Sequence, residues 1–179
     1  MFGKFDANTG ASGGSISVTG PVTIGPADIS VDASITSGAK RITWCFRGVT
    51  KNTVGSTHLS VIRVGSGAIV TTGYVQCGGW QGGANTNLSN NSTGFIWFDF
   101  ATFTAADLVL QATCIFTLMD ETNNIWAFQL TGSNTVAARD ENMQAGGSIA
   151  LAGALTIVRL TTLSGVPVFT AGEYSLIVE

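Results

Sequence analysis

The chain has 179 residues, of which 45% are hydrophobic and only 11% are charged, and its net charge is −3. The apolar content is enough for one packed domain, but the charged fraction is far below the ~25% usual in soluble domains. No dense cluster of Lys and Arg is present, so nucleic acid is not an expected partner, because phosphate binding depends on clustered cations. A surface poor in charge and rich in Ser, Thr, Asn and Gly is typical of β-sandwiches. It also indicates a protein whose faces are covered by partner copies.

Signals for metals, cofactors and membranes are weak along the whole chain. The three cysteines, Cys45, Cys77 and Cys114, lie far apart without a CxxC pattern, and His58 is the single histidine. No zinc site of familiar spacing can be written from them, so we expect free thiols and no metal or cofactor. No apolar run reaches the ~18 residues of a membrane-spanning helix, and the first residues lack the apolar segment of a signal peptide. We therefore expect synthesis in a reducing cytoplasm and no membrane insertion.

Residues 1–38 differ in composition from the rest of the chain. They are rich in Gly and Ser at first, and then contain short strand-like pieces separated by Gly-Pro pairs. Since proline cannot donate to a strand ladder, these pieces are predicted to be edge strands or an extended arm. The segment has too few apolar side chains for a core, so we expect it to pack on the main domain or on a neighbouring subunit. The apolar residues expected to make this contact are Phe2, Phe5, Ile16, Val18, Val22 and Ile24.

From residue 39 onward, alternating apolar and polar residues predict a compact sheet protein. The range 41–47 places Ile42 on the same face as two aromatic residues, and a longer alternation covers 108–119. Turn-forming residues at 120–124 then lead into a strand at 125–130, which predicts a hairpin. Further strands are expected at 59–64, 95–100, 148–151, 154–163 and 174–178.

Glycine-containing turns separate the predicted strands every ~8–12 residues. They are expected at 65–67, 78–79, 82–83, 164–165 and 172, and a single helical turn is expected at 104–107. This spacing predicts an all-β fold, namely a jelly-roll-like β-sandwich over residues 39–179, preceded by the extended N-terminal arm of residues 1–38.

The most distinctive local feature is the stretch Gly78–Gly83, in which Trp80 is flanked by pairs of glycines. Together with the Asn-rich residues 85–91 it is predicted to form a long polar loop. An indole ring close to several amides can stack on a sugar and hydrogen-bond its hydroxyls. The candidate residues for such a surface or glycan contact are Trp80, Gln81, Asn85, Asn87, Asn90 and Asn91. The alternative is that Trp80 packs on its own domain or on a neighbouring subunit.

The acidic residues do not predict an enzyme. Glycoside hydrolysis needs two carboxylates that face each other at about 5–9 Å. The pairs Asp120–Glu121 and Asp140–Glu141 are sequence neighbours, and adjacent side chains on a strand point to opposite faces. His58 can be drawn into a catalytic triad, but no Gly-x-Ser-x-Gly nucleophile elbow is present. We therefore expect no catalytic residues.

A series of segments from residue 39 to residue 179 has a recognisable order. The segments are Lys40–Thr43 with Phe46–Thr50, Leu59–Val75, Ser92–Phe98, Phe116–Phe128 and Gly146–Glu179. In this order they resemble the C-terminal β-sandwich domain of tail-fibre and minor virion structural proteins of tailed bacteriophages. Each segment is mostly strand and turn chemistry, so the specificity of the resemblance comes from the series and not from one motif.

The resemblance implies a bacteriophage virion structural protein, a component of a tail fibre or tail appendage that contacts the host surface. It also implies a homotrimer. Residues 1–38 would anchor the domain to other virion proteins, and residues 78–91 would face a host glycan or protein. The alternative is a capsid decoration (cement) or head-fibre protein that stabilises or decorates the capsid, with the arm stapling neighbouring capsomers.

Overall fold

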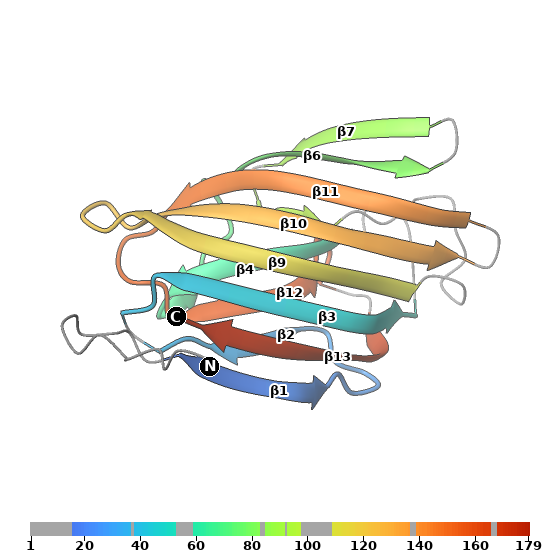
Figure 1. Cartoon of the computed structure of the whole chain (residues 1–179), viewed down its shortest axis with the longest axis horizontal. Coiled ribbons are helices and arrows are strands. Elements are labelled where there is room, and N and C mark those ends of the chain that lie inside the picture. The colour runs from blue at the N-terminus through green and yellow to red at the C-terminus, as the bar shows by residue number, and fades with distance from the viewer. Residues whose placement is uncertain are drawn as a thin grey trace, which may run out of the picture.

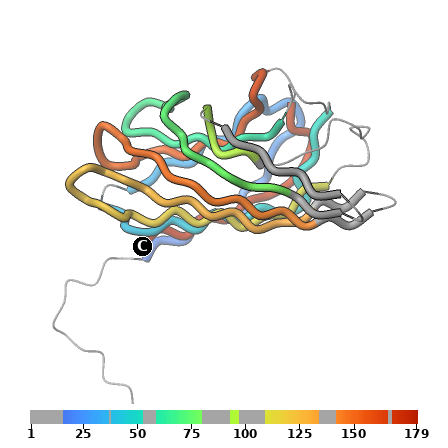
Figure 2. Tube along the Cα trace, turned by 90° about the horizontal axis from the view of Figure 1, so that it is seen from above, coloured from blue at the N-terminus to red at the C-terminus, as the bar shows by residue number. Residues whose placement is uncertain are grey.

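In the computed structural model, two antiparallel sheets pack face to face as a β-sandwich (Figure 1), which confirms the predicted fold class. The structure describes residues 16–36, 38–52, 59–82, 85–91, 93–97, 109–136, 139–165 and 168–179. Figure 2 shows the two layers from above.

The large sheet has eight strands in the order β1-β13-β3-β9-β10-β11-β6-β7. Their bounds in this order are Ser17–Thr23, Phe169–Val178, Arg41–Lys51, Val109–Asp120, Ile125–Val136, Arg139–Ala150, Val75–Gly82 and Asn85–Asn91. The neighbours β3 and β9 are separated by more than fifty residues in the chain, so the sheet is assembled from distant segments.

The small sheet has five strands and packs against one side of the large sheet. Its order is β2 (Val31–Ser34), β12 (Ile157–Thr162), β4 (Ser60–Ser66) and β5 (Ala68–Ile69), and β8 (Phe95–Trp97) also pairs with β4. The core between the sheets is fully buried at Phe95, Phe116 and Phe128, whose rings lie 4.1–6.1 Å apart between centroids. Close aromatic packing of this kind stabilises a core beyond the area that it buries.

The strands with strict alternation form where the sequence predicts them. In β3 the predicted apolar face is buried, with Ile42 and Trp44 inaccessible to solvent. The hairpin of β9 and β10 closes through Asp120, whose carboxylate accepts hydrogen bonds from the backbone N–H groups of Thr122 and Asn123. The helical turn expected at 104–107 lies outside the described residues.

Residues 16–36, which belong to the predicted arm, are part of the sandwich. Strand β1 pairs with β13 at one edge of the large sheet, and β2 pairs with β12 in the small sheet. Ile24 is 2% exposed and lies in the common core, together with Val31 and Ile35. Of the two possibilities left open for this segment, packing on the main domain describes residues 16–36.

Several predicted turns are strands instead. Gly78 and Gly79 lie inside β6, and β10 and β11 extend well beyond the predicted ranges 125–130 and 148–151. Glycine has a low β-propensity, so these segments resemble turns when they are considered alone. Close packing explains their glycines, because a Cβ on Gly78 would lie 2.6 Å from the Cβ of Ala145 on the neighbouring strand.

Candidate functional site

The predicted polar loop at 78–91 is a β-hairpin, and the loop assignment was wrong. Strands β6 and β7 pair over their full length and form one edge of the large sheet, as seen at the top of Figure 1. The backbone of Trp80 pairs with Met143 on one side and with Asn87 on the other. The hairpin brings the backbones of the six predicted glycan-contact residues onto two adjacent strands. The side chains of Trp80, Gln81, Asn85, Asn87, Asn90 and Asn91 lie outside the described part of the structure.

The predicted anchoring residues divide into three groups. Ile16 and Val18 are 65% and 68% exposed, whereas Val22 packs against the core and Ile24 is buried in it. Phe2 and Phe5 lie outside the described residues. Ile24 therefore has a structural role in the sandwich, whereas Ile16, just before β1, and Val18, on β1, are exposed.

The side of the large sheet that faces away from the small sheet is the broadest regular surface of the molecule, and we call it the outer face. Side chains alternate along each strand, so the residues between those of the buried core point to this side. One cross-strand row runs through Cys45, Thr113, Thr131 and Gln144 on four successive strands. The outer face comprises Ser175, Ile177, Thr43, Cys45, Gln111, Thr113, Ile115, Thr117, Ala127, Gln129, Thr131, Ser133, Asn142, Gln144, Gly146, Ser148, Val75, Cys77 and Gly79.

The residues named here are uncharged, and their polar side chains carry hydroxyls, amides or thiols, while Arg41, Arg47 and Glu173 lie on the same face of β3 and β13. Two shallow hollows mark its centre. One lies over Gly146 and is lined also by Cys77, Gln129 and Gln144. The other lies over Gly132, between Cys45 and Asn142. The first hollow exists because Gly146 has no side chain between Gln129 and Cys77, its cross-strand neighbours. Gly132 faces the core side of β10, so it contributes only its backbone to the second hollow.

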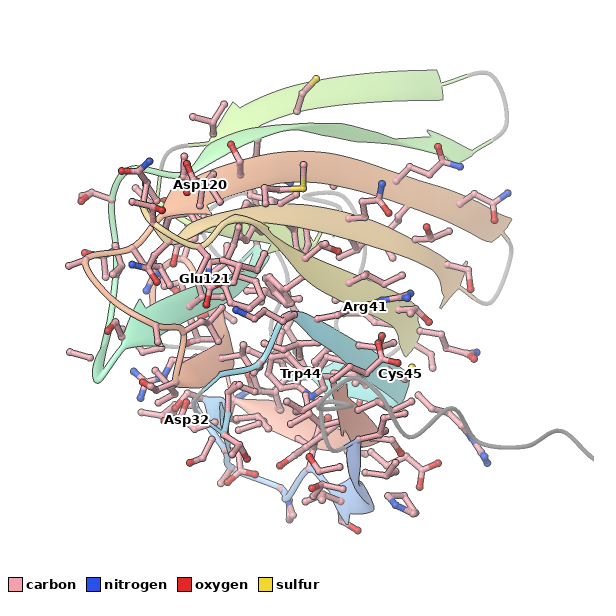
Figure 3. All side chains as sticks on the ribbon, turned by 60° about the vertical axis from the view of Figure 1, so that its left-hand side comes forward. Asp32, Arg41, Trp44, Cys45, Asp120 and Glu121 are labelled. Carbon is pink, nitrogen blue, oxygen red and sulfur yellow. The ribbon has the colours of Figure 1, made fainter. Side chains whose placement is uncertain are left out.

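Ion pairs lie on the β3 and β13 side of the outer face, both beside the ends of these strands and, for Arg47 and Glu173, within them. Arg41 pairs with Glu179, and Arg47 pairs with Glu173, at 3.6 and 3.4 Å. Lys40 pairs with Glu121 beside the β9–β10 turn, where Figure 3 labels Glu121 and Asp120. Each of these cations has an anion of the same chain beside it, so this side of the face carries little uncompensated charge.

The opposite surface, on the small sheet, has a different character. Arg159 makes a bidentate ion pair with Asp32, with two N–O distances of 2.6 Å, and its neighbour Arg63 donates to the carbonyl of Thr93. The adjacent Asp32 raises the pKa of the Arg159 guanidinium. The charged groups of this region lie on β2, β12 and β4, whereas those described on the large sheet lie on and beside β3 and β13 and at the β9–β10 turn.

The acidic residues with described side chains are placed in turns and surface pairs. Asp120 lies at the surface, and hydrogen bonds from the side chain and backbone of Asn123 lower the pKa of its carboxylate. This carboxylate organises the hairpin turn, and its neighbour Glu121 is engaged by Lys40. No cluster of three or more potential metal ligands occurs among the described residues. His58 lies outside them.

The three cysteines are free, as expected. Cys114 is fully buried, and burial raises the pKa of its thiol well above the ordinary value. Cys77 is exposed and Cys45 half-buried, both on the outer face, and Figure 3 labels Cys45 beside its buried neighbour Trp44.

Within the described ranges, none of the secondary structure is a helix that is long and apolar enough to cross a membrane. Comparisons of the sequence with family models and with curated proteins, and of the fold with solved structures, found no match.

Proposed function

We propose that this chain is a structural protein of a tailed-bacteriophage virion, a component of a tail fibre or tail appendage that contacts the host surface. The observation that supports the proposal is the ordered resemblance of residues 39–179 to the C-terminal domain of such proteins. The resembling segments correspond to successive strands and turns of one sandwich, including β3, β4 and the β9–β10 hairpin. A resemblance that follows a continuous fold in order is a stronger basis than any isolated motif.

The architecture is compatible with a protein that acts through its surface. Its long antiparallel strands present one broad face and an edge hairpin, β6–β7, which carries the candidate host-contact residues. Such sites on a rigid sheet can bind without a conformational change. In this proposal the β6–β7 hairpin faces the host, residues 1–38 connect the chain to other virion proteins, and the assembled unit is a homotrimer.

Labelling of intact particles tests the location. Antibodies raised against the purified chain, detected with gold in electron micrographs of the phage that encodes it, should mark the tail. Labelling confined to the head would contradict the tail assignment and favour capsid decoration. A purified particle that carries no label, and in which mass spectrometry finds no peptide of this chain, would overturn both virion roles.

Binding to host cells tests the contact surface. We expect Trp80→Ala to lower the binding of the purified protein to host cells at least threefold, because loss of an aromatic platform removes a stacking contact. Ile29→Ala is the matched control, because Ile29 is 55% exposed and lies outside the hairpin. Equal loss of binding in both variants, or no loss in Trp80→Ala, would contradict the assignment.

A further inference from the structure

A row of three charged side chains crosses the outward side of the small sheet. Asp32 on β2, Arg159 on β12 and Arg63 on β4 are direct cross-strand neighbours, and we call them the charged row. Figure 3 labels Asp32. The residues before and after each of the three are buried, so side-chain alternation directs the whole row away from the core. Two guanidinium groups and one carboxylate leave the row with a net charge of +1.

The two arginines of the charged row differ in how their charge is compensated. Arg159 directs its Nε and Nη2 at the two carboxylate oxygens of Asp32, at 2.6 Å each. Arg63 instead donates its Nε–H to the neutral carbonyl of Thr93, at 2.9 Å. Among the residues that the structure describes, no acidic side chain forms an ion pair with Arg63. The uncompensated charge of the row therefore lies at Arg63.

The neighbouring backbone holds the side chain of Arg63 in place. Besides the hydrogen bond to Thr93, the chain at Gly94 lies over the aliphatic stem, because a Cβ there would be 3.2 Å from the Cγ of Arg63. The Nε–H is used by Thr93, so the Nη1 and Nη2 groups carry the donors that remain. A side chain that is already fixed in this way loses little conformational entropy when a ligand binds.

The charges of the row indicate which ligand fits. Arg63 and Arg159 face each other across a strand pair, and like charges in that arrangement are unfavourable, so an anion beside them offsets the repulsion. The planar fork of a guanidinium group matches the two oxygens of a carboxylate. One negative charge balances the row, whereas a phosphate dianion or a polyanion would also be repelled by the carboxylate of Asp32. A carboxylate is therefore the best match.

The size of the surface favours a small ligand over a protein. The strands β2, β12, β4 and β5 span about 14 Å at a spacing of about 4.8 Å, and β12, the longest after β4, extends for about 17 Å. The resulting area of roughly 250 Å² is far below the ~800 Å² that each partner contributes to a stable protein complex. A single sugar unit or a small acid fits within it.

We propose that the charged row binds the carboxylate of a small acidic ligand, with Arg63 as the main contact and Arg159 as a second donor. Uronic acids, the sugars that carry a carboxylate, belong to this class, as do simple carboxylic acids. The inference rests on the small sheet alone. It depends neither on a role in the virion nor on the β6–β7 hairpin.

Nuclear magnetic resonance titration of the isotope-labelled chain tests the proposal, because an arginine Nε–H gives its own signal. Sodium glucuronate should shift the signals of Arg63 and Arg159 with a dissociation constant in the millimolar range, as expected for a surface ion pair. Glucose and sodium chloride at equal concentrations are the ligand controls and should leave both signals in place. Sodium acetate separates the two sources of the carboxylate. Binding at least threefold weaker than that of glucuronate identifies a sugar, and equal binding identifies a simple acid; both support the site.

Three variants test the roles of the residues. Arg63→Gln should weaken glucuronate binding at least fivefold, measured on the Arg159 signal. Arg47→Gln is the matched control and should leave binding unchanged, because Arg47 is an exposed arginine of the large sheet, paired with Glu173. Asp32→Asn should strengthen binding at least threefold, because it releases Arg159 and raises the charge of the row. A purely structural role of these residues does not predict that gain.

Three results would overturn the proposal. The first is that glucuronate shifts neither arginine signal more than sodium chloride does. The second is that Arg47→Gln weakens binding as much as Arg63→Gln, and the third is that inorganic phosphate binds more tightly than glucuronate. If Arg63→Gln fails to fold, the Asp32→Asn variant decides, and unchanged binding in it rejects the site. Localisation on virions is a separate measurement, so failure of the virion role and failure of this site are distinguishable.

Discussion

The hydroxyl group of Tyr74 connects strand β4 to the residue that follows β5 in the small sheet. It is 3% exposed, accepts a hydrogen bond from the N–H of Val64 and donates one to the carbonyl of Val70, at 2.9 and 2.8 Å. Burial raises its pKa to about 12, despite the opposing effects of the Val64 hydrogen bond and Arg63. The folded protein therefore favours the neutral phenol.

This pKa predicts a specific loss of stability at high pH. An unfolded tyrosine ionises near pH 10, so the stabilising contribution is complete below pH 10 and is lost as the pH rises towards 12. Between pH 10 and pH 12, the ionisation of Tyr74 should lower the free energy of unfolding by up to about 1.4 kcal/mol per pH unit. Tyr74→Phe should reduce that slope and, at pH 7, cost about 1–3 kcal/mol, because the N–H of Val64 loses its partner. Urea unfolding of the wild type and of Tyr74→Phe at pH 7 to 12 measures both effects. Tyr174, whose pKa is also raised, contributes equally to both proteins. If stability fell with pH at the same slope in both, the prediction would be contradicted.

Phe128 is a second residue with a measurable structural role. Its ring stacks on Phe95 at 4.1 Å between centroids and lies 5.2 Å from Phe116, and it is 1% exposed. Phe128→Ala should lower the free energy of unfolding by about 3–5 kcal/mol, because it leaves a cavity between the sheets. Chemical denaturation measures the loss. The control Ile29→Ala should change stability by no more than about 0.5 kcal/mol, and a similar loss in both would refute the placement of Phe128 in the core.

At the scale of elements, two adjacent glycines of β11 have opposite environments. A Cβ on Gly147 would lie 3.1 Å from both the Cα of Gln76 and the ring of Phe95, and closer still to the carbonyl oxygen of Val75. Gly146 points to the outer face and has open space. The strand pairing between β11 and β6 therefore depends on Gly147 having no side chain, but not on Gly146 having none.

Alanine at each of these positions separates the two roles. Gly147→Ala should destabilise the protein by about 1–3 kcal/mol, because the strands must move apart to accommodate the methyl group. Gly146→Ala should be neutral or stabilise slightly, since glycine weakens a strand interior by roughly 0.5–1 kcal/mol. Thermal unfolding of the two variants checks the difference, and equal midpoints would show that β11 and β6 do not approach as closely as described.

The strands whose bounds the sequence predicts from periodicity are those with side chains that alternate strictly. β3 and β9 have large apolar residues at every second position, so their type and approximate bounds follow from period alone. β6 and β7 do not, because their Gly and Asn residues have low β-propensity, and long-range packing overrides that preference. Gly132 is similar, since a Cβ there would lie 2.8 Å from the Cβ of Ala112 on β9. The need for glycine at such a position comes from a side chain on the neighbouring strand, so the sequence of the strand itself does not reveal it.

At the scale of the whole molecule, the outer face could be predicted only in part. The alternation in 108–119 already separates Gln111, Thr113 and Thr117 from the core residues. What the sequence does not contain in readable form is the order of the strands, which places Cys45 on β3 beside Thr113 on β9, a strand distant in the chain. Thr131 and Gln144 follow on β10 and β11, the next two strands of the chain. The outer face is a property of the assembled sheet, so local patterns indicate its composition and not its extent.

Residues 1–38 were predicted to be one arm, but residues 16–36 contribute two strands to the sandwich. A test of the anchoring role must therefore treat residues 1–15 separately. Deleting residues 1–38 removes β1 and β2 together with the buried side chains of Ile24, Val31 and Ile35. We expect this deletion to lower the free energy of unfolding by at least about 3 kcal/mol, because each buried aliphatic side chain contributes roughly 1.5–3 kcal/mol. Loss of incorporation into particles would then reflect unfolding as much as a lost anchor.

Deleting residues 1–15 separates the two explanations. This shorter deletion removes Phe2 and Phe5 but leaves β1 and β2 complete, so the unfolding midpoint in urea should match that of the full chain. If the first residues anchor the chain to other virion proteins, incorporation into particles, measured by quantitative blotting of purified phage, should fall severalfold at unchanged stability. Unchanged incorporation would reject residues 1–15 as the anchor. Attention would then move to the exposed Ile16, just before β1, and to Val18 on β1, where Val18→Ser tests the sheet edge directly and removes no core side chain.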